Sequence, residues 1–177
     1  DIICSSANNI ELVEQQRNIQ VVMLDEIGRW DSRRTKPGLV QTRAMVTLVE
    51  GPNSLIAQAG EAGARVRTLR PHEATVGQAL VFTGLPQTEG YFVGLRYAQV
   101  EEDTEEELSV VEAVPDEDPM ARTLGMQLVT ISGRLMERQG KLLSMQFADQ
   151  LVPVRLPDQL DQELLPKIGS EVAVRGV

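Results

Sequence analysis

The chain has 177 residues, enough for two small domains that each lie near the lower size limit for an independent hydrophobic core. Its net charge is −9 and only 3% of its residues are aromatic, which argues against tight non-specific binding of nucleic acid by the whole surface. Ten of the acidic residues lie between positions 101 and 119, where no Lys or Arg occurs, so the remainder of the chain is close to neutral.

Residue types that carry catalysis or bind metals are scarce. Cys4 is the only cysteine, which excludes an intrachain disulfide and a cysteine-based metal cluster within one chain. The only histidine, His72, has no neighbour in sequence that would orient it as a base, so we expect it to face solvent. No phosphate-binding loop and no metal-ligand spacing occurs. The sequence therefore predicts no catalytic residue, no metal and no cofactor, and a chain that is not an enzyme.

No apolar run approaches the roughly 20 residues that cross a bilayer, so no membrane span is expected. The sequence does not assign a compartment, although a cytoplasmic location is slightly favoured over a periplasmic one.

Residues 1–41 form an N-terminal extension with mixed signals. A short helix is predicted over Ile10–Arg17 and a strand over Ile19–Leu24. The stretch 32–38 is predicted to be an exposed basic loop.

Residues 42–100 show β-branched and apolar residues in short blocks bounded by Gly, Pro and Asn, the pattern of a small all-β domain. Pro71 separates the third strand from the fourth, and residues 84–90 are expected to connect the last two strands. The five predicted strands are Ala44–Val49, Leu55–Ala59, Arg65–Leu69, Gln78–Thr83 and Tyr91–Val100.

Residues 101–119 form an acidic linker with three interpretations. It is a solvated tether extended by its own repulsion, a competitor for a basic groove, or a segment that presents apolar residues to a partner. The third interpretation rests on Leu108, Val110 and Val111, with Val114 beyond them, which form an apolar strip inside the acidic run.

Residues 120–177 repeat the strand order of the first unit. Asp158 is placed to cap an amphipathic helix that carries Leu160, Leu164 and Leu165 on one face. No fifth strand is predicted, so we expect an open edge, filled by a continuation of the chain, by a strand from the extension, or by a partner. The predicted strands are Leu128–Glu137, Leu142–Phe147, Val152–Leu156 and Glu171–Arg175.

The repetition is visible in the sequence itself. The stretch VGQALVFTG at 76–84 returns as IGSEVAVRG at 168–176, and LVE at 48–50 returns as LME at 135–137. A repeat of this length, with its own set of strands in each copy, is typical of two small barrels and not of a solenoid, whose period is about 20 to 50 residues.

The second unit resembles the oligonucleotide/oligosaccharide-binding (OB) superfamily, in its RPA-like and tRNA-anticodon-type members. The resemblance rests on Gly133-Arg134-Leu135, Phe147-Ala148-Asp149, Val152–Leu156, the helix and the stretch 168–176. It implies a mainly β fold with two small five-stranded OB-like barrels in tandem, and a short helix between strands 3 and 4 of the second. The superfamily pattern carries no catalytic residue.

OB barrels hold single strands with stacked aromatic residues and a cationic groove. Arg65 and Arg67 are two apart on one strand and therefore share a face. The alternative interpretation of the basic residues is an ordinary solvated polar face. The candidate nucleic-acid-binding residues are Arg65, Arg67, Arg70, Tyr91, Arg96 and Tyr97 in the first unit, and Arg134, Lys141 and Arg155 in the second.

Three functions remain open at this stage. The leading hypothesis is a non-catalytic interaction or scaffold module of a larger assembly, with other protein subunits as partners. The second is a single-stranded nucleic-acid-binding protein that uses the first barrel. The third is an extracytoplasmic β-barrel domain of an envelope or secretion complex.

Overall fold

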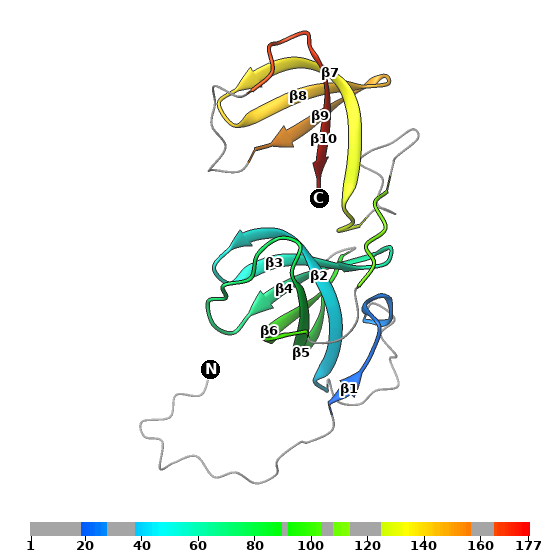
Figure 1. Ribbon diagram of the computed structural model, residues 1–177, viewed down its shortest axis with the longest axis vertical. Helices are drawn as coiled ribbons and strands as arrows, with labels where there is room; N and C mark the ends of the chain where they lie inside the picture. Colours follow the sequence, from blue (N-terminus) through cyan, green and yellow to red (C-terminus); the bar gives the residue numbers. More distant parts are fainter. Residues whose placement is uncertain (1–18, 28–37, 90–91, 104–107, 114–124, 157–164) are drawn as a thin grey trace.

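The computed structural model describes residues 19–27, 38–89, 92–103, 108–113, 125–156 and 165–177, which form a closed five-stranded barrel and a separate four-stranded sheet (Figure 1). Within these residues the one helical element is a 3₁₀ turn, η2 (Leu24–Glu26). The strands are β1 (Gln20–Val21), β2 (Val40–Gly51), β3 (Ser54–Ala59), β4 (Ala62–Thr68), β5 (Ala79–Glu89), β6 (Phe92–Glu102), β7 (Val129–Gln139), β8 (Leu142–Phe147), β9 (Gln150–Arg155) and β10 (Glu171–Gly176).

The barrel closes through one parallel pairing. Strands β2, β3 and β4 form an antiparallel meander, β4 pairs in parallel with β6, and β6 pairs with β5, which returns to β2. Parallel neighbours need a long crossover, and here β5 lies within it. This strand order is compatible with an OB-like fold.

Strand β2 is long enough to pair with two other strands of the barrel, β5 and β3. Its first half, from Val40 to Met45, pairs with β5, and its second half pairs with β3. The register shifts after Val46 and again after Val49, and such bulges bend a strand around a barrel corner. Alternate residues of β2 are buried, as a strand with one face on a core requires.

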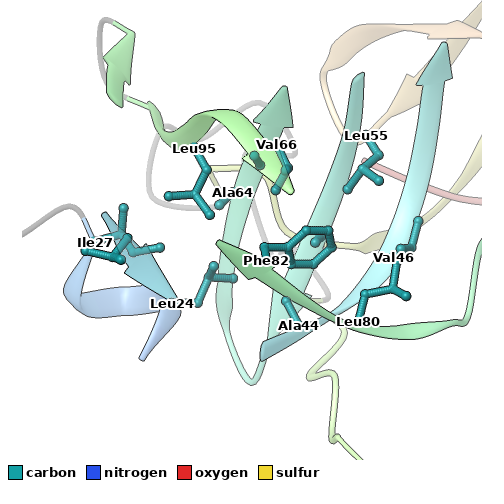
Figure 2. Packing of buried hydrophobic residues seen from close by; sticks show 13 residues of the cluster. Leu24, Ile27, Ala44, Val46, Leu55, Ala64, Val66, Leu80, Phe82 and Leu95 are labelled. Atoms are coloured by element: carbon teal, nitrogen blue, oxygen red, sulfur yellow. The ribbon is translucent and has the colours of Figure 1, made fainter. Parts of the chain in front are cut away.

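The barrel interior is a close-packed apolar cluster. Phe82 on β5 is fully buried and lies at its centre, with Val46 and Leu55 on one side and Leu24 and Leu95 on the other (Figure 2). Burial of a side chain of this size stabilises the fold by roughly 1.5–3 kcal/mol.

The N-terminal part of the described chain covers one side of this core. Strand β1 pairs in parallel with the start of β2, opposite Val40 and Gln41. Strand β3 pairs with β2 only from Met45 onward, so β1 meets a part of β2 that β3 does not reach. Strand β1 leads into η2, whose Leu24 is buried in the cluster together with Ile27. The strand predicted over Ile19–Leu24 is therefore shorter, and its end is a 3₁₀ turn.

The second unit is a four-stranded antiparallel sheet in the order β10-β7-β8-β9. Its core consists of Ile131, Leu135, Leu143, Met145 and Val152. No strand among the described residues joins β9 to β10, so the expected second barrel is not formed by this part of the chain. The predicted helix beginning at Asp158 lies largely outside the described residues.

One predicted connection is a strand instead. Residues 84–89 continue β5 and pair with β6, with Pro86 opposite Leu95. Proline has no N–H to donate, but β2 pairs with β5 only as far as Gly84, so beyond it one side of β5 needs no donor. The predicted helix over Ile10–Arg17 and most of the basic loop at 32–38 lie outside the described residues.

Candidate binding surfaces

The outer face of β4 and β6, which we call the arginine face, carries Arg65, Arg67, Phe92, Arg96 and Tyr97. The residues between them, including Val66 and Leu95, point into the core. The strands pair with Arg65 opposite Gly94, so Arg67 lies beside the Arg96-Tyr97 step. Side chains that are far apart in the sequence are therefore neighbours on one surface.

Arg65 on this face is already engaged in an ion pair. Its Nε donates to Glu50 Oε2 at 3.0 Å and its Nη2 to Glu50 Oε1 at 2.8 Å, a bidentate arrangement. Beside it, Arg67, Gln87 and Phe92 line a hollow of only about 10 Å³. That volume is about one water molecule, so this hollow is too small to hold a base.

A bulge in β6 exposes the Tyr97 ring on this face. Tyr97 has φ of 54° in a region that non-glycine residues rarely occupy, and the register shifts here against both β4 and β5. The Arg96 guanidinium lies 5.5 Å from the centroid of the Tyr97 ring, within cation–π range, and Tyr97 is 58% exposed. Backbone strain of this kind costs of order 1–3 kcal/mol and often accompanies a functional position.

A broad hollow of about 690 Å³ lies beside the bulge, lined by the connection from Thr68 to Ala74 and the end of β6. The lining of this hollow contains Arg70 together with Glu73, Glu101 and Glu102, so the hollow carries charges of both signs. His72 is half-buried and not solvent-facing, because its Nδ1 accepts from the Ala74 N–H at 3.2 Å. The Nε2 of this side chain is buried and has no hydrogen-bond partner among the described residues.

The outer face of β3 is covered by the chain itself. Gln58 is fully buried, and its Nε2 donates to Gly60 O at 2.8 Å and to Val111 O at 2.7 Å. Its Oε1 accepts from the Leu128 N–H at 2.7 Å. Gly60 also forms a β-bridge with Val110. Residues 108–113 and 126–128 therefore lie on the barrel, where Val111 remains 45% exposed and Val110 and Leu108 are half-buried.

The basic residues of the second sheet lie on separate elements. Arg134 on β7 pairs with Glu171 on β10, with Nε 3.3 Å from Oε1. Lys141 lies in the turn next to Arg155, because the Leu156 N–H donates to the Lys141 carbonyl. Arg175 donates to Glu112 Oε2 at 2.8 Å, which ties β10 to the segment 108–113. Tyr91 lies outside the described residues.

The core of this sheet is only partly covered. Val172 and Val174 on β10 and Val154 on β9 are half-buried, although they pack against the buried cluster. In the barrel, the residues at the corresponding places in β5 are Leu80, 2% exposed, and Phe82, fully buried. The difference is that β6 covers the barrel core, and the described residues provide no such strand over the second sheet.

Comparison with known proteins assigns no family, because no family model and no curated protein matches this chain. Among the described residues, no group of three or more His, Cys, Asp or Glu is arranged to hold a metal ion. In the same part of the chain, no helix is sufficiently long and apolar to span a membrane.

Proposed function

We propose that this chain is a non-catalytic module that binds other proteins, built from two OB-like units in tandem. The observation that carries the proposal is the half-covered core of the second sheet. A sheet whose apolar core residues stay accessible between two edges that no described strand pairs with is a ready site for another polypeptide.

Matched hydrogen bonds support the tandem arrangement. The Gly77 N–H donates to the Val46 carbonyl and the Val46 N–H to the Gln78 carbonyl, while Gly169, Leu135 and Ser170 repeat both bonds in the second sheet. Gly77 and Gly169 have φ of 90° and 91°. Since the two glycines need the same left-handed conformation at the same place, the return of 76–84 at 168–176 is accompanied by a repeated local structure. In that local structure Leu135 takes the place of Val46 and not that of Leu48.

A second match lies at the turn that follows the second strand of each unit. Gln58 donates its amide to the carbonyl of Gly60, and Gln146 donates its amide to the carbonyl of Ala148 at 3.5 Å. Gly60 and Ala148 both have positive φ. The outer face of this turn is covered in the first unit and exposed in the second.

The experiment is affinity capture with full-length chain from cells that express it, using two variants with matched exposure. Leu151 on β9 is 66% exposed and Val76 in the barrel connection is 63% exposed. Leu151→Glu is expected to abolish capture of a stoichiometric protein partner, and Val76→Glu to leave it unchanged. A chain that is monomeric in sedimentation and captures nothing would contradict the proposal.

A second candidate function, binding of single-stranded nucleic acid, is favoured by one observation. Arg67, Arg96 and two aromatic rings share the arginine face, the combination that OB-type sites use for phosphates and bases. The test is anisotropy of labelled poly-dT at about 50 and 200 mM salt, since phosphate-driven binding weakens steeply over that range. Arg67→Ala should weaken binding and Arg134→Ala on the second sheet should not; no binding at low salt would exclude this function.

A further inference from the structure

We propose that the hairpin turn between β8 and β9, residues 146–151, docks an extended segment of another protein in the way in which the barrel turn, residues 58–63, holds residues 108–113. The inference deepens the proposed function and rests on it, because it specifies where a partner binds and which main-chain groups it must bring. The occupied turn of the barrel shows what kind of occupant fits, and the second sheet repeats that turn.

In the barrel, this docking is made by main-chain groups and one amide side chain. The Gly60 N–H donates to the Ser109 carbonyl, and the Gly60 carbonyl accepts from the Val111 N–H, both at 2.9 Å. The Gln58 Nε2 donates to the carbonyls of Gly60 and Val111 and so holds the turn and the segment together. All of these bonds use the main chain of the segment, so the turn recognises an extended backbone.

The strand registers place the second turn in the corresponding position. Gln58 lies opposite Met45 on β2, and Gln146 lies opposite Arg134 on β7. Met45 and Arg134 each directly precede the residue that carries the matched hydrogen bonds of the two units. In both hairpins two residues connect the paired strands, and the first of these residues has positive φ. The two turns are therefore equivalent in register, length and backbone conformation.

The second turn carries the same groups without an occupant from the described part of the chain. Gln146 and Ala148 are exposed, and no described residue forms a β-bridge with Ala148. The Gln146 Nε2 lies 3.5 Å from the Ala148 carbonyl, whereas the Gln58 Nε2 lies 2.8 Å from the Gly60 carbonyl. Ala148 also has φ of 47°, a conformation that glycine adopts easily and alanine does not. The strained turn is thus maintained although the contact that it makes in the barrel is missing.

One difference between the turns limits the occupant to a single segment. Opposite Gln58 lies Gly63, where the Met126 carbonyl approaches so closely that no side chain would fit. The residue at the corresponding place opposite Gln146 is Leu151, which is 66% exposed. The Leu151 side chain blocks a second stretch of chain such as 126–128, but it offers an apolar contact to a segment that follows the path of residues 108–113.

The segment 108–113 also defines the chemistry of the occupant. Leu108 and Val110 are half-buried, whereas Ser109 and Val111 between and after them are exposed. The occupant should therefore be extended, with apolar residues at two alternate positions. Proline is excluded at the place of Val111, because the N–H of that residue donates to the turn. Recognition of this kind adds an extended peptide to exposed main-chain groups of a sheet.

The probe is a synthetic peptide of residues 108–113 with acetylated and amidated ends, titrated into the ¹⁵N-labelled full chain. The barrel turn is already filled by the tethered segment, so the second turn is the site that the free peptide reaches. We expect saturable shifts of the Ala148 and Asp149 amide signals and of the Gln146 side-chain amide. A peptide with Val111→Pro should produce none of these shifts.

Two variants of the full chain test the role of the amide side chain. Gln146→Ala should weaken peptide binding at least threefold, because the donor to the peptide carbonyl is lost. Gln139→Ala is the matched control, since Gln139 is half-buried at the end of β7 and also bonds to a residue two positions away, Glu137. This control should leave peptide binding unchanged.

Several results would overturn the inference. One is absence of shifts at the second turn with several millimolar peptide, and another is binding that neither Val111→Pro nor Gln146→Ala alters. Full protection of the Ala148 amide from hydrogen exchange in the free monomer would show that the chain itself covers the turn. A dimer that dissociates on Gln146→Ala would identify a second copy, and not another protein, as the occupant.

The capture experiment separates this inference from the proposed function. A captured partner that is retained by Gln146→Ala and leaves the Ala148 amide unprotected would leave the proposed function standing and remove the docking turn. Absence of any captured partner would remove the proposed function and, with it, the assignment of this turn to another protein.

Discussion

At the scale of single residues, Gln58 joins the barrel to the segment that follows it. Its amide forms three hydrogen bonds from a fully buried position, with Gly60, Val111 and Leu128. A buried donor or acceptor left without its partner costs about 1–3 kcal/mol. The side chain therefore holds two stretches of chain on the outer face of β3.

Gln58→Ala is expected to lower the free energy of unfolding by about 2 kcal/mol, since the Leu128 N–H and the Val111 carbonyl lose their partner. Urea denaturation measures this. Gln146→Ala is the matched control, because Gln146 makes a corresponding bond to Ala148 but is exposed, and its effect should stay within about 0.5 kcal/mol. Equal effects of the two substitutions would show that the buried amide has no special role.

Glu112 gives the junction a dependence on pH. The hydrogen bond with the Thr130 side chain lowers the pKa of this carboxyl most, desolvation opposes the shift, and Arg175 lowers the pKa further. Because the folded pKa lies below the unfolded one, the ionised form favours the folded state. This contribution is complete above the usual pKa of about 4.3 and is lost as the pH falls through the folded value.

We therefore expect the Arg175 contact to weaken in acid. A ¹³C titration of the Glu112 carboxyl should give a midpoint below the usual glutamate pKa of about 4.3, and Arg175→Gln should raise this midpoint. Exchange of the Val129 and Thr130 amides should increase over the same acidic range. A Glu112 midpoint at or above the usual glutamate value would contradict this assignment.

The strands of the barrel follow from sequence patterns, but their closure does not. Alternation of polar and apolar residues placed Arg65 and Arg67 on one face, as the structure has them. The bulge at Tyr97 left no local signal, because it arises from register shifts against two partner strands. The role of Gln58 was equally hidden, since its three partners include residues 53 and 70 positions away.

Errors at the strand ends have a similar origin. Gly84, Pro86 and Gly90 together are typical of a loop. Strand β5 nevertheless continues through Gly84 and Pro86, because this part of β5 pairs with β6. Tertiary pairing overrides local propensity where a strand needs hydrogen bonds on one side only. The candidate residues of the second sheet could be identified by type, but their dispersal over β7, the Lys141 turn and β9 depends on the sheet order.

The parallel contact between β4 and β6 closes the barrel and leaves no room at Gly94. An added Cβ there would lie 2.2 Å from the Arg65 carbonyl oxygen. Gly94→Ala should therefore destabilise the barrel by about 2 kcal/mol, the cost of forcing two packed strands apart. Gly51→Ala, where nothing lies within 4 Å, is the control in the same urea experiment. Similar midpoints for both variants would argue against tight closure.

In the molecule as a whole, two hydrophobic cores depend on each other unequally. The barrel closes on itself, whereas the sheet follows a segment that is docked on the barrel by Gln58. Met145→Ala should cost about 2–5 kcal/mol in the sheet and leave the barrel folded, while Phe82→Ala should loosen both. Hydrogen exchange resolved by strand measures this, and equal loss of protection in the barrel with Met145→Ala would contradict it.

The two β-bridges of the segment 108–113 also have a mechanical consequence. Val110 is bridged to Gly60 on the barrel and Ala113 to Val129 at the start of β7, so only two residues, Val111 and Glu112, lie between these anchors. A chain extends by at most about 3.6 Å per residue, which leaves little slack. Tension applied to the sheet would reach the barrel through these bridges directly, and the connection would transmit a load instead of absorbing it.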